Sequence, residues 1–267
     1  MTRILVTNDD GINAEGIRKL TESLGKIAEV YVAAPAAQQS AKSQSLTIRR
    51  PITVEEIGVD GAHKAFAVEG TPADCVMWAI PEFAAQGIEF DYLFSGINMG
   101  DNAGIAAYYS GTISAAREGA LRGVKSIALS VCSHEATHFD YICNLIPRLM
   151  KMSDSVGPAT IISVNAPDIP VQEVKGVRVI EAAPWGYRET YGFHETAPGE
   201  YRIGRVILPD NRSWPQIRTD NDFKYDLDCI RAGYVAISPL TSEASDRIAL
   251  GKLQGLWPQD AVGEIPG

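Results

Sequence analysis

The chain has 267 residues, of which 45% are hydrophobic, so it is long enough to bury one large core. Its formal net charge of −9 argues against a nucleic-acid polymer as partner, because an acidic surface repels polyanions. The glycine, proline and charged fractions are ordinary, which argues against global disorder.

The N-terminal part of the chain begins as a strand–helix–strand unit. A strand is predicted at residues 3–7, and a helix follows that Asn13 would cap and that runs to about Leu24. A second strand is predicted at residues 29–33, and this order implies parallel pairing of the two strands. A polar loop rich in Gln, Ser and Ala then covers residues 35–45.

The next segment predicts a hairpin and a strongly marked helix start. Strands at residues 46–54 and 64–68 flank a Val-Asp-Gly turn signal. Thr71 then fits the N-cap position, with Pro72 at N1 and Asp74 at N3, which is the pattern of a capping box that begins a helix.

Strands and helices continue to alternate up to about residue 170. A strand at 91–95 precedes a helix at 110–122, and a strand at 126–131 precedes a helix at 139–152. A further strand is predicted at residues 160–164. This alternation predicts an α/β fold with a Rossmann-like, doubly wound and mostly parallel sheet.

The C-terminal part has a different character, with strands that lack intervening helices. The predicted elements are strands at 177–182 and 201–208, a short helix at 227–231, a strand at 234–238 and a final helix at 242–253. We expect a single domain, residues 1–267. Its parts are an α/β core to about residue 170, a β-rich hairpin extension over about 171–225, and a C-terminal strand with a helical arm over about 226–267.

The four cysteines and the N-terminus favour a reducing compartment. The cysteines form no C-x-x-C pair and lie in apolar segments, so we expect buried free thiols. No basic signal sequence precedes the first strand, and no segment approaches the roughly 20 apolar residues that span a bilayer. We therefore expect a cytoplasmic protein without membrane association.

Two adjacent carboxylates, Asp9 and Asp10, follow directly after the first predicted strand. Ligands of open α/β sheets bind beyond the carboxyl ends of the strands, and hard oxygen ligands held there suit Mg²⁺ or Mn²⁺. The alternative is an ordinary Asp-Gly turn or a helix cap, and the spacing leaves both interpretations open.

Three further elements would lie at the same edge of the sheet. Ser40 lies in the polar loop, Asn98 and Asn102 lie in a glycine-rich stretch after another strand, and Ser110-Gly111-Thr112 begins a helix whose free amides could hold phosphate. Each alone also fits a loop, a turn or an N-cap. Their convergence favours a metal and phosphate site.

Other nucleotide and hydrolase motifs are absent from the sequence. There is no phosphate-binding P-loop, no dinucleotide fingerprint after the first strand and no nucleophile elbow. His134 and His138 are four residues apart, but they precede a helix in a polar stretch, and we do not expect them to bind a metal together.

The chain closely resembles the survival protein E (SurE) nucleotidases, which are metal-dependent phosphatases of nucleoside monophosphates. The resemblance covers residues 3 to about 240, and its motifs are specific in order and spacing. The matching segments are RILVTNDDGI at 3–12, AP at 34–35 through Ser40 to SLT at 45–47, GTPADCV at 70–76, SGIN at 95–98, SGT at 110–112, VNAP at 164–167 and GYVAISPL at 233–240.

The resemblance implies a role for each candidate residue. The metal ligands would be Asp9, Asp10, Ser40 and Asn98, with one divalent ion, Mg²⁺ or Mn²⁺, per subunit. The residues that bind the phosphate of the substrate would be Asn102, Ser110, Gly111 and Thr112. Asp9 and Asp10 would carry catalysis, and the resemblance also implies a homodimer or homotetramer.

The chain departs from the family pattern at several positions. Ala41 follows Ser40 where glycine is common in the family, and Asp101 adds negative charge near the predicted phosphate site. Residues 182–222 match poorly, so no specificity residue is transferred there. Base preference and the choice between 5′- and 3′-monophosphates stay open.

The expected reaction is hydrolysis of a nucleoside monophosphate to nucleoside and phosphate. A divalent ion would polarise the phosphoryl oxygens and activate water for direct attack. A covalent aspartyl-phosphate on Asp9 is the mechanistic alternative. An alternative of another class is a nucleotide-binding regulatory protein with little turnover.

Overall fold

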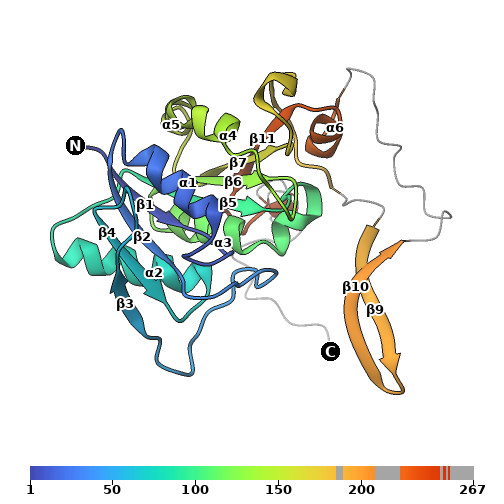
Figure 1. The fold of residues 1–267 in the computed structure, drawn as a ribbon, viewed down its shortest axis with the longest axis horizontal. Coiled ribbons are helices and arrows are strands. Elements are labelled where there is room, and N and C mark those ends of the chain that lie inside the picture. The colour runs from blue at the N-terminus through green and yellow to red at the C-terminus, as the bar shows by residue number, and fades with distance from the viewer. Residues whose placement is uncertain (185–188, 208–222, 247–248, 251, 253–267) are drawn as a thin grey trace.

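The computed structural model describes residues 1–184, 189–207, 223–246, 249–250 and 252 (Figure 1). The strands of its main sheet are β1 (Arg3–Thr7), β2 (Glu29–Pro35), β3 (Val54–Ile57), β4 (Lys64–Val68), β5 (Tyr92–Met99), β6 (Lys125–Val131), β7 (Thr160–Ala166), β8 (Val177–Val179) and β11 (Val235–Thr241). The helices are α1 (Glu15–Leu24), α2 (Pro72–Ala85), α3 (Gly111–Leu121), α4 (Asp140–Asn144), α5 (Ile146–Asp154) and α6 (Asp226–Arg231). Two short 3-10 helices are η1 (Gly104–Tyr108) and η2 (Val171–Glu173).

The main sheet has nine strands in the order β3-β4-β2-β1-β5-β6-β7-β11-β8. All neighbours are parallel except β3 with β4 and β11 with β7. The prediction of a doubly wound and mostly parallel sheet is therefore confirmed.

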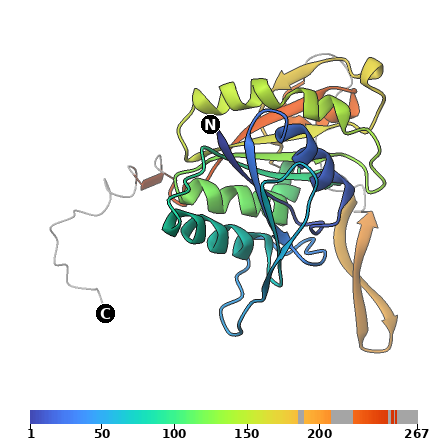
Figure 2. The same ribbon diagram turned by 60° about the vertical axis from the view of Figure 1, so that its left-hand side comes forward.

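Helices cover both faces of the sheet, because the side chains of each buried strand alternate between the two faces. On one face, α1, α4 and α5 pack over side chains that include Ile4 and Val6 (Figure 1). On the other face, α2 and α3 pack over side chains that include Leu5 and Leu93 (Figure 2). No helix of the described residues is long and apolar enough to cross a membrane.

The helix start predicted at Thr71 is confirmed in detail. The Thr71 hydroxyl accepts a hydrogen bond from the Asp74 amide at 3.1 Å, and the Asp74 carboxylate accepts one from the Thr71 amide at 2.8 Å. The same two side chains also bind the preceding loop, through the Ser45 carbonyl at 2.7 Å and the Thr47 amide at 3.0 Å.

The strand predicted at residues 46–54 is wrong, because the β-strand begins only at Val54. Thr47 is committed to the α2 cap, and Pro51 has no N–H to donate to a strand ladder. The hairpin itself is confirmed, since β3 and β4 pair antiparallel.

Two helix predictions also need correction. Asn13 does not cap α1, whose N-cap is Ala14, because residues 11–14 form a turn in which the Ala14 amide donates to the Gly11 carbonyl at 3.0 Å. The helix predicted at residues 139–152 is two helices, α4 and α5. Pro147, at the start of α5, cannot donate the hydrogen bond that would continue α4.

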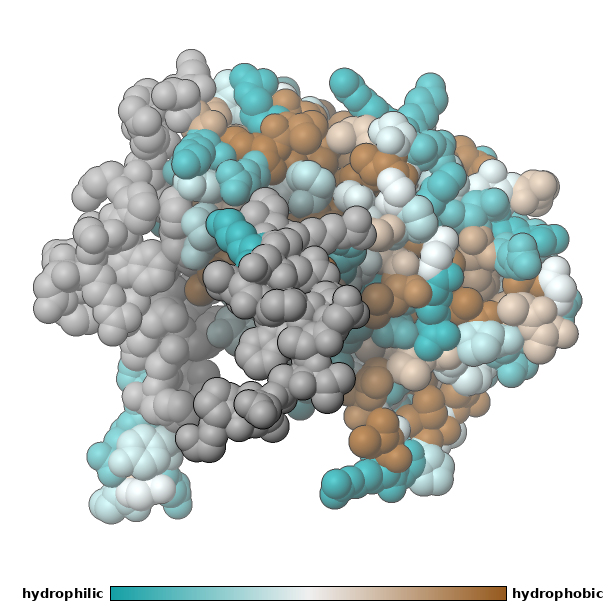
Figure 3. Space-filling model, turned by 180° about the vertical axis from the view of Figure 1, so that it is seen from behind, coloured by the Kyte–Doolittle hydropathy of each residue, from teal (hydrophilic) through white to brown (hydrophobic). Residues whose placement is uncertain are grey.

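A hairpin of β9 (Glu189–Ala197) and β10 (Glu200–Ile207) forms a second, two-stranded sheet. It projects from the body of the molecule (Figures 1 and 2), and its described tip is hydrophilic (Figure 3). The strand predicted at 201–208 corresponds to β10. The strand predicted at 177–182 is shorter and belongs to the main sheet as β8, where it pairs with β11.

The C-terminal elements were predicted in part. The short helix and the following strand correspond to α6 and β11. The helix predicted at 242–253 does not begin at Ser242, since residues 242–246 are not helical, whereas residues 249, 250 and 252 are. The remainder of the predicted helical arm and the whole of segment 208–222 lie outside the described residues.

Candidate metal and phosphate site

Most of the predicted site residues lie beyond the carboxyl ends of β1 and β5, whereas the hydrogen-bond partners of Asn102 lie on the neighbouring strands β6 and β7. The strands β1 and β5 are neighbours, and the chain leaves β1 toward β2 on one side and returns through β5 on the other. Such a reversal of strand order is where ligands bind in doubly wound sheets. Asp9 and Asp10 follow β1, and Asn98 lies near the end of β5.

The Asn8 side chain shapes the turn that presents the two carboxylates. Its amide nitrogen donates to the Gly11 carbonyl at 2.8 Å, and its amide oxygen accepts from the Gly11 amide at 3.2 Å. Gly11 has φ +99°, which glycine adopts without a steric penalty. Asn8 thus fixes the backbone of Asp9 and Asp10, a role that was not predicted from the sequence.

Asp9 is a buried carboxylate at the N-terminus of α3. Its side chain is 3% exposed, and its Oδ1 accepts a hydrogen bond from the Thr112 hydroxyl. The pKa of Asp9 is raised from 3.8 to about 6, chiefly by burial; the hydroxyl and amide of Thr112 lower this pKa, and the neighbouring Asp10 raises it. A cation beside Asp9 would offset the cost of this buried charge.

Gly111 allows α3 to approach Asp9 this closely. A Cβ atom at Gly111 would lie 2.7 Å from Asp9 Cβ and 2.9 Å from Asp9 Oδ2. Any larger residue would therefore displace either the carboxylate or the helix start. Ser110, the N-cap of α3, accepts the Ile113 amide through its Oγ at 3.1 Å.

Asp10 and Asn98 are joined through the end of β5. The Met99 amide donates to Asp10 Oδ2 at 2.9 Å, while the Asn98 amide nitrogen donates to the Gly100 carbonyl at 2.7 Å. Burial raises the pKa of Asp10, which the Met99 amide partly opposes. Because the nitrogen of Asn98 is bound to Gly100, its amide oxygen is the group that could serve as a ligand.

His134 lies beside this part of the site and was not predicted as a site residue. A Cβ atom at Gly100 would come within 3.3 Å of His134 Cε1, and the charge of His134 lowers the pKa of Asp10. His138 instead contacts Asp168, with 2.9 Å between its Nδ1 and Oδ1. The two histidines therefore have different neighbours: His134 lies near the candidate metal ligand Asp10, and His138 lies against Asp168.

Hydrogen bonds from residues on either side of Ser40 tie its loop to the site. The Gln39 amide donates to the Asp9 carbonyl at 2.7 Å, and the Ser43 hydroxyl donates to the Tyr108 carbonyl at 2.8 Å. Ser40 itself is exposed. Ala41 has φ +58°, the left-handed region that favours glycine, which gives a physical reason for the glycine expected at this position.

Asn102 is buried in the loop between β5 and η1. Its backbone amide donates to Asn165 Oδ1 at 2.8 Å, and its side-chain nitrogen donates to Ser130 Oγ at 2.9 Å. Asn165 and Ser130 were not predicted as site residues. Each is a polar residue near the end of an apolar strand, and this signal could have identified them.

The donor set fits a hard divalent cation. Two carboxylates, an amide oxygen and a hydroxyl are the oxygen ligands that Mg²⁺ and Mn²⁺ prefer. Within the described part of the chain, no three His, Cys, Asp or Glu side chains form a metal-binding group. The neutral oxygens of Ser40 and Asn98 are the candidates to supplement the two carboxylates as ligands.

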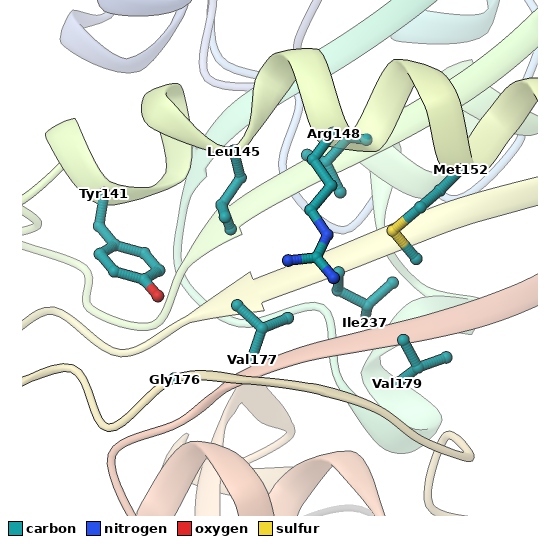
Figure 4. Close-up of a pocket in the computed structure, with 9 residues that line it drawn as sticks. Tyr141, Leu145, Arg148, Met152, Gly176, Val177, Val179 and Ile237 are labelled. Carbon is teal, nitrogen blue, oxygen red and sulfur yellow. The ribbon is translucent and has the colours of Figure 1, made fainter.

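A cavity of about 480 Å³ lies elsewhere, between α4–α5 and the strands β8 and β11 (Figure 4). Apolar side chains such as Leu145 and Val177 form most of its lining, with the guanidinium of Arg148 among them. None of the predicted site residues lines it. The carboxylate site at β1 and β5 is therefore the better candidate for chemistry.

Comparison with known proteins identifies one family. Residues 4–189 match the family model described as "Survival protein SurE". The chain is 37% identical to a protein named 5′-nucleotidase SurE from Aeromonas hydrophila, over 96% of this chain and 98% of the relative. A relative of the same name from Haemophilus influenzae is also 37% identical, over 97% and 98% of the two chains.

A solved structure has the same fold. The crystal structure of SurE from Aquifex aeolicus superimposes with a TM-score of 0.77 and 29% sequence identity. The match covers 95% of this chain and 99% of that chain.

Proposed function

Since this chain belongs to the survival protein SurE family, we propose that it is a metal-dependent phosphomonoesterase that hydrolyses nucleoside 5′-monophosphates to nucleoside and phosphate. The names of its relatives support nucleotidase activity. The observation that carries the proposal is the buried Asp9 carboxylate, held against the N-terminus of α3 at the reversal of strand order.

Asp9, Asp10, Ser40 and Asn98 would hold one Mg²⁺ or Mn²⁺. The ion would supply Lewis-acid polarisation of the phosphoryl oxygens. Thr112 orients Asp9 through its hydroxyl, so the side chain that faces the ion is fixed before a ligand arrives.

The phosphate would lie at the start of α3, held by Ser110, Gly111, Thr112 and Asn102. A helix N-terminus offers amide donors and a favourable dipole for an anion. These donors would stabilise the charge that develops on the phosphoryl oxygens during attack by water. Water is our preferred nucleophile, and an aspartyl-phosphate on Asp9 is the competing route; direct detection of phosphorylated Asp9 would decide for the latter.

The first test is release of phosphate from adenosine and guanosine 5′-monophosphates with Mn²⁺ or Mg²⁺, against an EDTA control. We expect release with metal and none with EDTA. A parallel series with 3′-monophosphates defines the positional specificity. If no metal supports release but nucleotides still bind, the regulatory binding protein becomes the better interpretation.

Asp9→Asn provides the matching variant. Loss of one of two carboxylate ligands should lower kcat/KM by more than about 100-fold, because metal affinity and phosphate activation both depend on the Asp9 carboxylate. Circular dichroism should show an intact fold. Asp60→Asn, in an exposed turn, is the control and should retain full activity; full activity of Asp9→Asn would remove the metal-site argument.

We also propose a cytoplasmic homodimer or homotetramer without membrane or nucleic-acid-polymer partners. The four cysteines are free, which suits a reducing compartment, and Cys75 and Cys229 are buried as expected, whereas Cys132 and Cys143 are partly exposed. The projecting hairpin of β9 and β10 supports a partner subunit, because an unsupported two-stranded hairpin is only marginally stable in water.

A further inference from the structure

Asp226 is a buried acid at the start of α6, remote in sequence from the candidate site. It is 1% exposed, and its carboxylate accepts three backbone hydrogen bonds. Its Oδ2 accepts the Gly104 amide at 2.9 Å. Its Oδ1 accepts the Ala183 amide at 2.9 Å and the Leu227 amide at 2.8 Å.

The Asn102 loop, residues 100–103, lies between β5 and η1. The bond to Gly104, the first residue of η1, fixes the C-terminal end of this loop. The first half is anchored by strands, since the Gly100 amide donates to the Val131 carbonyl at 2.9 Å and the Asn102 amide donates to Asn165. Beyond Asn102, the loop turns toward α6. Ala103 is 1% exposed and packs in a small apolar cluster with residues of α6.

The chain between Ala183 and Asp226 contains the β9–β10 hairpin and is called here the hairpin excursion. The bond to Ala183 closes the base of this excursion. Ala183 lies on the outgoing side of this excursion and Asp226 on the returning side. The two sides also meet where the Asp226 amide donates to the Glu181 carbonyl at 3.0 Å. One carboxylate therefore joins three segments: the Asn102 loop, the base of the excursion and α6.

We propose that Asp226 is a positioning residue, which holds the Asn102 loop in its phosphate-binding position and couples that loop to the base of the hairpin excursion. The proposal rests on the proposed function for the role of Asn102. Buried hydrogen bonds to a charged acceptor are stronger than neutral ones, so the geometry of the loop depends on this carboxylate.

The test is the Asp226→Asn variant, with Asp228→Asn as its matched control. An asparagine replaces one acceptor oxygen by an NH₂ group, so it cannot accept from both Gly104 and Ala183. Asp228 lies on the same helix, is 5% exposed and loses the same charge, but the Gly104 and Ala183 amides donate to Asp226 and not to it.

Hydrogen exchange gives a readout that is independent of activity. In Asp226→Asn we expect faster exchange of the backbone amides in residues 100–106 and 181–184, with the remaining strands of the sheet unchanged. Asp228→Asn should retain the wild-type exchange in both segments. Unchanged exchange in Asp226→Asn, or equal acceleration in both variants, would overturn the proposal.

Binding of inorganic phosphate to the Mn²⁺-loaded protein separates positioning from general destabilisation. Asp226→Asn should weaken phosphate binding about tenfold in calorimetry, which corresponds to 1.4 kcal/mol. Its affinity for Mn²⁺ should equal that of the wild type, because the amides that donate to the Asp226 carboxylate belong to Gly104, Ala183 and Leu227 and not to the candidate metal ligands. A parallel loss of Mn²⁺ and phosphate affinity would overturn the positioning role.

Failure of the proposed function has a different signature. If the wild type binds phosphate but releases none from nucleotides, the nucleotidase proposal fails. The exchange and phosphate-binding results for Asp226→Asn still decide whether Asp226 is a positioning residue. Wild-type protein that does not bind phosphate would remove the assigned role of Asn102. The exchange experiment would then test only the coupling of the loop to the base of the excursion.

Discussion

At the scale of single residues, Asp9 shows a conflict between stability and the proposed chemistry. A buried carboxylate without a cation is costly when ionised, and this cost is what raises its pKa to about 6. The contribution of Asp9 to the free energy of unfolding is therefore greatest below pH 3.8, its unfolded value, and is lost as the pH rises through about 6.

Asp9→Asn should therefore stabilise the metal-free protein at pH 8, by on the order of 2 kcal/mol, because it removes the ionised buried group. At pH 4 the stabilising effect should largely vanish, since the wild-type carboxyl is then protonated. Thermal unfolding in EDTA at the two pH values measures this difference. An equal shift of Tm at pH 4 and pH 8 would contradict it.

At the scale of secondary-structure elements, the close approach of α3 to the turn after β1 is the critical contact. Gly111→Ala would place a methyl group 2.7 Å from Asp9 Cβ. We expect this variant to lose at least about tenfold in metal affinity, as displaced supporting groups do in other metal sites. It should also lose roughly 1–3 kcal/mol of stability through overpacking.

Titration calorimetry with Mn²⁺ and thermal unfolding measure the two effects of Gly111→Ala. Gly157→Ala is the control, since no atom lies within 4 Å of the methyl group that it adds. Wild-type metal affinity in Gly111→Ala would show that the helix start tolerates a side chain and that the close contact is not needed.

Elements with local signals were predictable, and those defined by distant partners were not. Thr71, Pro72 and Asp74 are neighbours that together specify the start of α2, and they were assigned correctly. The strand expected at residues 46–54 fails because Thr47 bonds to Asp74, a partner 27 residues away. Sequence periodicity contains no information about such a contact.

The residues of the candidate site likewise fall into those that the sequence predicts and those that it does not. The positions of Asp9, Asp10 and Asn98 follow from strand ends, which the sequence marks well. The supporting residues Asn165 and Asp226 accept hydrogen bonds from backbone amides of remote segments, Asn165 from Asn102 and Asp226 from Gly104 and Ala183. Only the three-dimensional arrangement identifies those bonds.

At the scale of the whole molecule, the projecting hairpin of β9 and β10 leads to a prediction about assembly. Light scattering should give the mass of a dimer or tetramer for the wild type. Replacing the hairpin by a short Gly-Ser linker should lower that mass, because the hairpin would lose its contacts with a partner subunit.

The α/β core should remain folded in the hairpin-deletion variant, since β9 and β10 pair only with each other among the described strands. Circular dichroism and thermal unfolding would check this. A monomeric mass for the wild type, or an unchanged mass for the variant, would contradict a role of the hairpin in assembly.

The strand order at the far edge of the sheet has a consequence for protein synthesis. β8 precedes β11 in the chain. In the sheet, β8 is the edge strand, and β11 is the strand with which it pairs. A growing chain therefore contains β8 before β11, the strand with which it pairs, has been synthesised. At ordinary elongation rates this interval is roughly 3 to 11 seconds, so β8 can join the main sheet only after that delay.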